Sequence, residues 1–374
     1  MHILAAIAGI LIILVILWDG FETIILPRRV TRNFRLARLF YKVTWKPVAG
    51  LARRISNERQ RQALLSYYGP ASLILLIIFW AANLILGFAL LQWANGSQLS
   101  TSSNFVAGTP LANGKNLANF FNDLYLSASA FFTITFGDIL PTTGVSRFLA
   151  AAEGGLGFGF LALIIGYLPA LNNAFSRREV SVTMLDERAG TPPTAYRFIE
   201  RSRAWGGPEP VNKFLLEWER WCAELMESHL SYPVLAYFRS QHENQSWVAA
   251  LTMVLDLAAL SITGLDGVSQ ESAQLAFAMA RHAAVDLTQI FNTPPRSPSL
   301  QRMTVDDLFH LREALKKAGV TLREGPEADQ KLVQLRLLYE PYMNALAGYL
   351  EMDLPPWLPV QTAYDNWETS AWER

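Results

Sequence analysis

The chain has 374 residues, of which 51% are hydrophobic and 17% are charged. This composition is too apolar for a wholly soluble protein, and the length suits two or three domains. The formal net charge is zero, with 32 basic and 32 acidic residues. The charges are spread unevenly along the chain, so their positions carry more information than their sum.

Three segments are long and apolar enough to cross a bilayer, which takes about 20 residues of helix. They are Ile3–Trp18, extendable to Leu26, then Ala71–Ala94, and Phe148–Leu171 with Glu153 as its only charge. A cleaved signal peptide is the alternative for the first segment. No basic residue precedes it and no small-residue cleavage site follows it, so we expect residues 1–26 to be a retained transmembrane helix.

The basic residues predict the orientation. Residues 28–61 contain eleven Lys or Arg and one acid, Glu58, whereas residues 95–132 contain only Lys115 and Asp123. The positive-inside rule then predicts that the basic linker, residues 27–68, lies in the cytosol. We therefore expect a multi-pass protein of the cell membrane with its N-terminus outside and its C-terminal domain in the cytosol.

An apolar segment too short to cross, "NFFNDLYLSASAFF" at residues 119–132, lies between the second and third spans. Its length predicts a re-entrant helix. The polar stretch that follows it must then be buried in protein or line water, because lipid cannot satisfy its backbone groups.

That stretch, "TITFGD", resembles the selectivity-filter signature of potassium channels, Thr-Val-Gly-Tyr-Gly-Asp, and it follows a pore-helix-like segment as in that family. The resemblance covers residues 69–172 and implies a pore module at 69–175 with an outer helix, pore helix, filter and inner helix. It also implies a homotetramer that conducts a monovalent cation, and potassium is the first expectation for that cation. The implied filter residues are Thr133, Ile134, Thr135, Phe136, Gly137 and Asp138.

The filter chemistry has physical requirements. Backbone carbonyls replace the hydration shell of the ion, and the backbone must enter the left-handed region, which glycine does without steric cost. Gly137 fits this need, and Asp138 would attract cations at the outer mouth. Thr135 replaces the first glycine of the signature, so we expect either another backbone geometry or strain there, and strict potassium selectivity is left open.

The third span contains five glycines, and the sequence allows two explanations for them. Gly157 and Gly159 are the predicted gating hinge, but glycines also allow close packing between membrane helices. Glu153 is predicted to support the filter from behind, near Asp138; the alternative places it at headgroup level.

Residues 176–374 are expected to form an all-helical cytosolic domain. Helical spacing recurs at residues 210–230, 231–241, 246–262, 271–291 and 327–352. The apolar run at 247–262 has Asp256 in its middle and is predicted to be a buried core helix rather than a fourth span. His229, His242 and Cys222 match no metal-ligand spacing, and core or surface roles are expected for them.

The sequence therefore predicts an all-α membrane protein that acts as a tetrameric cation channel of the potassium-channel pore type and is not an enzyme. No cofactor, no nucleic-acid partner and no metal beyond the permeant ion are expected, and no regulatory ligand can be identified. Two alternatives remain: a non-conducting membrane-anchored sensor or scaffold, and a tethered enzyme, for which no nucleophile and base can be identified.

Overall fold

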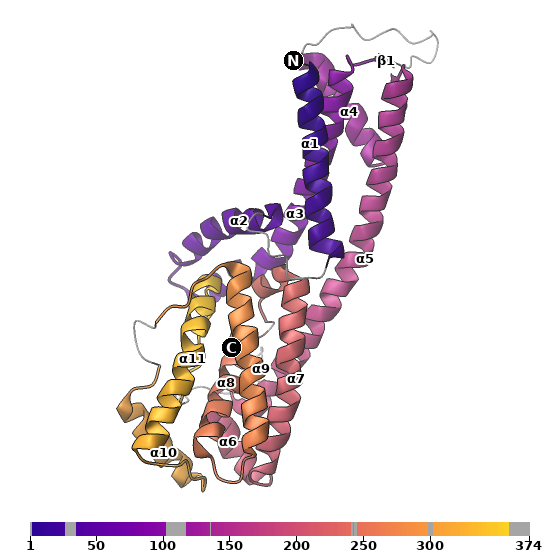
Figure 1. Cartoon of the computed structure of the whole chain (residues 1–374). Helices are drawn as coiled ribbons and strands as arrows, with labels where there is room; N and C mark the ends of the chain where they lie inside the picture. Colours follow the sequence, from indigo (N-terminus) through magenta and orange to yellow (C-terminus); the bar gives the residue numbers. More distant parts are fainter. Residues whose placement is uncertain are drawn as a thin grey trace, which may run out of the picture. The chain divides into compact units, whose positions relative to one another are not determined.

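The computed structural model describes residues 2–26, 35–101, 117–134, 136–240, 242, 245–297 and 302–358. The described chain is helical almost throughout (Figure 1), as predicted. It divides into two compact units: Met1–Pro47 with Pro70–Asn172, and Val48–Gly69 with Asn173–Arg374. The helices of the first unit, three of which continue into the second, are α1 (His2–Gly20), α2 (Leu36–Ala52), α3 (Glu58–Ala94), α4 (Leu117–Phe131) and α5 (Gly144–Ala189).

The three predicted spans are helices α1, α3 and α5. A π-helical turn, Phe21–Ile25, extends α1 as the sequence suggested. By length and composition, all three are apolar enough to cross a membrane. Helix α5 has 46 residues and is longer than its predicted span, because its polar end continues without a helix-breaking residue after Pro169.

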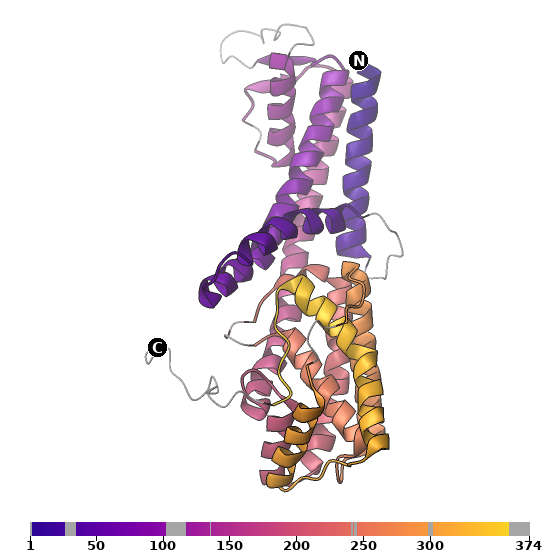
Figure 2. The same cartoon turned by 90° about the vertical axis from the view of Figure 1, so that its left-hand side faces the viewer.

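Helices α1 and α3 pack closely through two glycines, and Figure 2 shows them side by side. A Cβ atom on Gly9 would lie 2.7 Å from the carbonyl oxygen of Gly87, and one on Gly87 would lie 2.6 Å from Ile13 Cγ1. Small residues allow such backbone approach between membrane helices. These two glycines therefore fix the register of α1 on α3.

Asp19 joins three helices at the end of α1. Its buried carboxylate accepts hydrogen bonds from Trp80 Nε1 of α3, at 2.9 Å, and from the backbone N of Ala37 at the start of α2, at 3.0 Å. A carboxylate buried in this way is stabilised by its charge-assisted hydrogen bonds.

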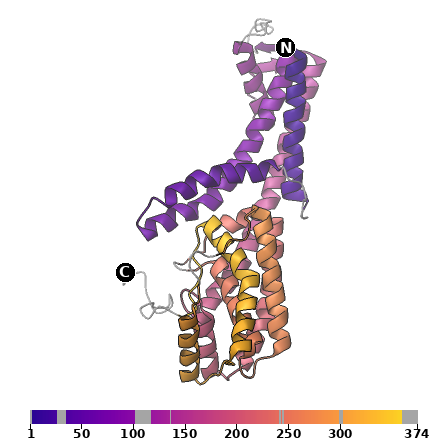
Figure 3. The same cartoon turned by 60° about the vertical axis from the view of Figure 1, so that its left-hand side comes forward.

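Helix α2 lies in the segment that the sequence marks as a basic linker. Its buried residues in this unit, Ala37, Tyr41 and Trp45, recur every four positions and form one helical face. The sequence does not predict this helix, because basic residues between these positions interrupt the apolar pattern. Figure 3 shows α2 as a separate helix after α1.

A small antiparallel sheet departs from the all-helical prediction. Strands β1 (Leu99–Thr101) and β2 (Ile139–Pro141) pair with Ser100 opposite Leu140. Thr142 extends the contact, because its backbone N and its Oγ1 both lie 2.9 Å from the carbonyl oxygen of Gln98. The sheet joins the segment after α3 to the segment just before α5.

The second unit is a helical bundle around α8 (Figure 1). Every residue from Trp247 to Thr263 is buried in it, against α9 and α11. The helix is long and apolar enough to cross a membrane, yet 94% of its most apolar window is buried within the protein. The prediction of a core helix is confirmed. The further helices of this unit are α6 (Ala195–Ala204), α7 (Glu209–Ser231), α8 (Trp247–Gly264), α9 (Gln270–Phe291), α10 (Val305–Lys317) and α11 (Pro326–Leu350).

Two helices of the bundle were not predicted, and one prediction was wrong. Helices α6 and α10 are short, with 10 and 13 residues, although their buried residues recur at helical spacing; α10 begins with a capping box of Thr304 and Asp307. The predicted helix at 231–241 is instead a 3₁₀ turn, Pro233–Tyr237. Pro233 cannot donate a backbone hydrogen bond, so the helix before it ends at Ser231.

Asp256, in the middle of α8, is held by a buried network. Arg302 donates to the Asp256 carboxylate at 2.6 and 3.1 Å, and it also donates to Glu340 at 3.2 Å. The Tyr339 hydroxyl donates to the same Asp256 carboxylate at 2.5 Å. Burial alone would lower the pKa of Arg302, but the two carboxylates outweigh it and raise that pKa. Arg302 therefore stays charged, and its positive charge allows a carboxylate inside an apolar core.

Candidate ion-conduction site

Helix α4 is the predicted re-entrant helix. Its 15 residues, Leu117–Phe131, nearly coincide with the predicted segment, and at about 1.5 Å per residue they span about 22 Å, less than the hydrocarbon core. The chain leaves the helix in a tight turn: Thr133 N donates to Ala130 O and Ile134 N to Ser129 O, each at 3.0 Å. Thr133 has a positive φ of 56° at this turn.

The described filter-like residues after the turn, Phe136, Gly137 and Asp138, are exposed in the single chain. Gly137 has a φ of 77°, the left-handed conformation expected of it, and no neighbouring atom would crowd a Cβ there. The backbone conformation, rather than lack of space, is what favours glycine. Thr135, on which the expectations of strain and altered selectivity rest, lies outside the described residues.

Tyr125 of α4 holds the end of this loop, and the sequence reading missed it. Its hydroxyl donates to the Asp138 carboxylate at 3.0 Å, and its ring stacks on Phe136 with centroids 6.3 Å apart. The backbone N of Ile139 also donates to Asp138, at 3.1 Å. A tyrosine two turns before the end of a pore-like helix was the available signal, because that position faces the returning chain.

Glu153 of α5 lies behind α4 and is only 1% exposed, so it faces protein. The Ser127 hydroxyl of α4 lies 2.5 Å from Glu153 Oε1 and 2.7 Å from the carbonyl oxygen of Ile85 in α3. A hydroxyl has one proton, so both contacts are hydrogen bonds only when Glu153 is protonated and donates to Ser127. This chain of bonds joins α5, α4 and α3; the partner of Glu153 in it is Ser127, not Asp138.

The two predicted hinge glycines have different surroundings. A Cβ on Gly157 would lie 1.9 Å from the carbonyl oxygen of Phe131, at the last residue of α4, whereas one on Gly159 would meet nothing within 4 Å. A Cβ on Gly154 would also contact α4, at 3.4 Å from the carbonyl oxygen of Ala130. Close packing therefore accounts for Gly157 and Gly154, and it does not account for Gly159.

Helix α5 is the least covered of the three spans. Only 11% of its most apolar window is buried, against 28% for α1 and 50% for α3. Its exposed large apolar residues within the first unit are Val145, Phe148, Phe158, Leu161, Leu163, Ile165 and Leu168. An apolar helix that is bare in the single chain is suited to contact lipid or further copies of the chain.

His229 and Cys222 are core residues of the second unit, as expected, and His242 is exposed. His229 Nδ1 lies 2.8 Å from the carbonyl oxygen of Leu225, and Nε2 lies 3.3 Å from Arg178 Nη1. Because a guanidinium only donates, Nε2 accepts and the ring is neutral. Burial, with Arg178 nearby, lowers the pKa of His229 to about 3.

The comparisons with known proteins agree with this geometry in the first unit. Residues 74–171, from the middle of α3 to the middle of α5, match the family described as ion channel. This part of the chain is an ion-channel pore domain, and the chain is a membrane protein; the matched family is one of channels and not of enzymes.

One relative is Protein LctB of Geobacillus stearothermophilus, with 32% identity over 92 residues. The match covers 24% of this chain and 64% of LctB, so the chain spans less than two thirds of that relative's length. No solved structure matches the chain. The residues after Asn172, which belong to the second unit, lie outside the match to the ion-channel family.

Proposed function

We propose that the chain is a subunit of a homotetrameric cation channel of the potassium-channel pore type. One observation carries the proposal: a helix too short to cross the bilayer ends in a tight turn, and a loop with a left-handed glycine and an acid leads back to a spanning helix. This arrangement lies wholly within the residues that match the ion-channel family.

In this proposal residues 69–175 form the pore module, and Thr133 to Asp138 form the filter. Backbone carbonyls of the loop coordinate the dehydrated cation, and the C-terminal end of α4 adds its negative helix dipole. Asp138, held by Tyr125, forms an acidic ring at the outer mouth. Potassium is the proposed permeant ion, and Thr135 is the residue most able to relax its selectivity over sodium.

The tetramer follows from the number of loops. One chain has one filter-like loop in its matched region, and a carbonyl-lined tube of this kind needs four around one axis. The bare apolar surface of α5 supports the same conclusion, since it would be covered by neighbouring subunits and lipid. Three further chains would also supply the missing sides of a filter loop that is exposed in the single chain.

We further propose that α5 is the gating helix, with Gly159 as its hinge rather than Gly157. The open surroundings of Gly159 leave room for bending, and glycine weakens a helix locally. The helical unit after α5, placed in the cytosol by the charge distribution, would bias this bending.

The reversal potential across a planar bilayer tests the proposal. Purified protein is reconstituted with concentrated potassium chloride on one side and, on the other, a more dilute mixture of sodium chloride with a little potassium chloride. We expect currents that reverse near the potassium equilibrium potential. Currents that reverse at the smaller potential of the same sign that the total cation gradient sets would keep the cation pore and overturn its potassium selectivity, whereas reversal at the chloride equilibrium potential, which has the opposite sign, would overturn cation conduction.

The matched variant is Asp138→Asn, which removes the proposed acidic ring without changing the size of the side chain. We expect a smaller conductance at low salt and an unchanged tetramer. If tetramers of the unmodified protein are shown to be intact and carry no current, the non-conducting scaffold is favoured instead.

A further inference from the structure

A cavity in the second unit belongs neither to the pore nor to the matched family residues. Its volume is about 240 Å³, and it lies where three connections between helices meet: α6 to α7, α8 to α9, and α10 to α11. Ligand pockets for drug-sized molecules usually measure about 300–1,000 Å³. A pocket of this size suits a smaller, metabolite-sized molecule.

The glycines at the three connections give the cavity its shape. Gly207, Gly267 and Gly319 all have a positive φ, between 76° and 79°. The guanidinium of Arg203 lies over two of them, since Cβ atoms on Gly207 and Gly319 would be 3.5 Å from its nitrogens. A side chain at either position would be strained by the positive φ, although its Cβ would make only an ordinary van der Waals contact with Arg203.

Six of the eleven residues that line the cavity have apolar side chains. They are Ile199, Pro208, Val211, Leu265, Val268 and Val320. Val211, Leu265 and Val268 are themselves buried, whereas Arg203 and Asp266 are exposed, so the cavity has an apolar floor and opens to solvent. A ligand would place a small aliphatic or aromatic group here and remove it from water.

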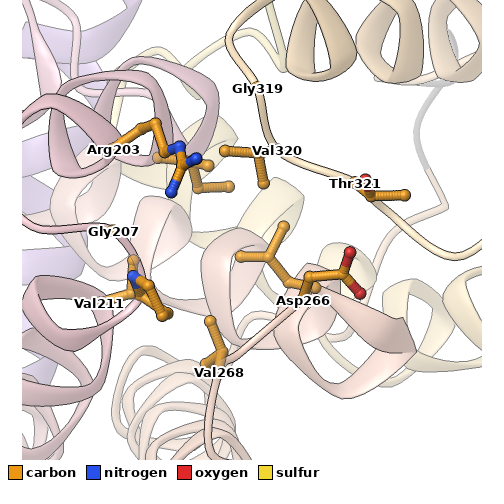
Figure 4. Close-up of a pocket in the computed structure, with 11 residues that line it drawn as sticks. Arg203, Gly207, Val211, Asp266, Val268, Gly319, Val320 and Thr321 are labelled. Carbon is orange, nitrogen blue, oxygen red and sulfur yellow. The ribbon is translucent and has the colours of Figure 1, made fainter.

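Two side chains of opposite charge, Arg203 and Asp266, line the cavity. Figure 4 shows Arg203 and Asp266 on different sides of it, with Val320 and Val268 at the remaining edges. They are not within the 4.0 Å of an ion pair, and in the described part of the chain neither side chain has a hydrogen-bond or ion-pair partner. Both charges are therefore free to bind a ligand.

We propose that this cavity binds a small zwitterion of the amino acid class with an apolar side chain. Arg203 would hold the carboxylate, for which a guanidinium provides two parallel donors. Asp266 would accept from the ammonium group, and the apolar wall would take the side chain. A carboxylic acid without the ammonium group would leave Asp266 unpaired and face its negative charge.

The test is calorimetric titration of the full-length protein in detergent with L-valine, L-leucine, L-methionine and L-phenylalanine. We expect saturable binding of at least one of them. Two analogues of leucine test whether the ligand needs both charged groups: 4-methylpentanoate lacks the ammonium group, and isoamylamine lacks the carboxylate. Both analogues should bind at least tenfold more weakly than leucine, if leucine is the amino acid that binds.

Two variants separate the roles of the charges. Arg203→Gln should weaken amino acid binding at least tenfold, and Asp266→Asn should do the same without weakening 4-methylpentanoate. Arg220→Gln is the matched control, because Arg220 is an exposed cation on α7 outside the cavity and should leave binding unchanged. Val320→Trp should fill the cavity and abolish binding, with the melting temperature as a check on folding.

Binding that survives Arg203→Gln or Asp266→Asn in full overturns the proposal, as does no saturable binding by any of the four amino acids to folded protein. These titrations involve no ion current. A failure of conduction and a failure of amino acid binding are therefore seen in different experiments.

Discussion

At the scale of single residues, the chain from Glu153 through Ser127 to Ile85 shows how a carboxyl group can be part of a membrane-embedded interface. The carboxyl is almost wholly buried, and its one close partner is a hydroxyl that also bonds a backbone carbonyl. A protonated carboxyl suits both bonds and avoids a buried charge.

This geometry predicts that Glu153→Gln is tolerated and Glu153→Ala is not. The glutamine amide can donate to Ser127 as the protonated acid does, so the tetramer, its melting temperature and its reversal potential should be unchanged. The alanine variant leaves Ser127 without this partner and opens a cavity, at a cost of about 1–3 kcal/mol. Size-exclusion chromatography and thermal melting measure both variants. Loss of current in the glutamine variant with an intact tetramer would show that an ionised carboxylate is needed.

At the scale of elements, the contact between α4 and α5 depends on glycine. The carbonyl oxygen at the end of α4 occupies the space where a side chain at position 157 would begin. The C-terminal end of α4 can therefore approach the backbone of α5 directly. A larger residue would push the two helices apart and displace the proposed filter loop that follows α4.

Gly157→Ala and Gly159→Ala form a matched pair on the same helix. The first should lower the melting temperature and reduce the fraction of conducting channels, since overpacking costs about 1–3 kcal/mol or more. The second should keep the melting temperature and lower the open probability, because alanine stiffens the proposed hinge. Equal effects of the two variants on stability would contradict the packing difference between these positions.

At the scale of the whole molecule, the proposed topology places the basic segment and the helical unit on one side of the membrane and the filter mouth on the other. The chain contains a single cysteine, Cys222, and it is buried. A cysteine introduced at an exposed position can therefore be labelled with a membrane-impermeant maleimide without background labelling of Cys222.

Two such positions test the topology in intact cells. Gly144→Cys, beside the filter mouth, should be labelled from outside, and Ser56→Cys, in the basic segment, should be labelled only after permeabilisation; both positions are exposed. The physical reason is the excess of basic residues in 28–61 over 95–132. Labelling of both positions in intact cells, with the membrane shown to be sealed, would rule out this orientation.

Local sequence patterns were enough to predict the spans, the short helix before the filter-like loop, the left-handed Gly137 and the core helix around Asp256. Length, apolar runs and glycine preference are local properties, so they can be read along the chain. The contacts between residues far apart in sequence come from the folded structure: Tyr125 with Asp138, Ser127 with Glu153, Gly157 with Phe131 and Arg302 with Asp256. These pairs are 13 to 46 residues apart, and nothing in the spacing of one partner specifies the other. The cavity beside Arg203 likewise exists only because three distant connections meet.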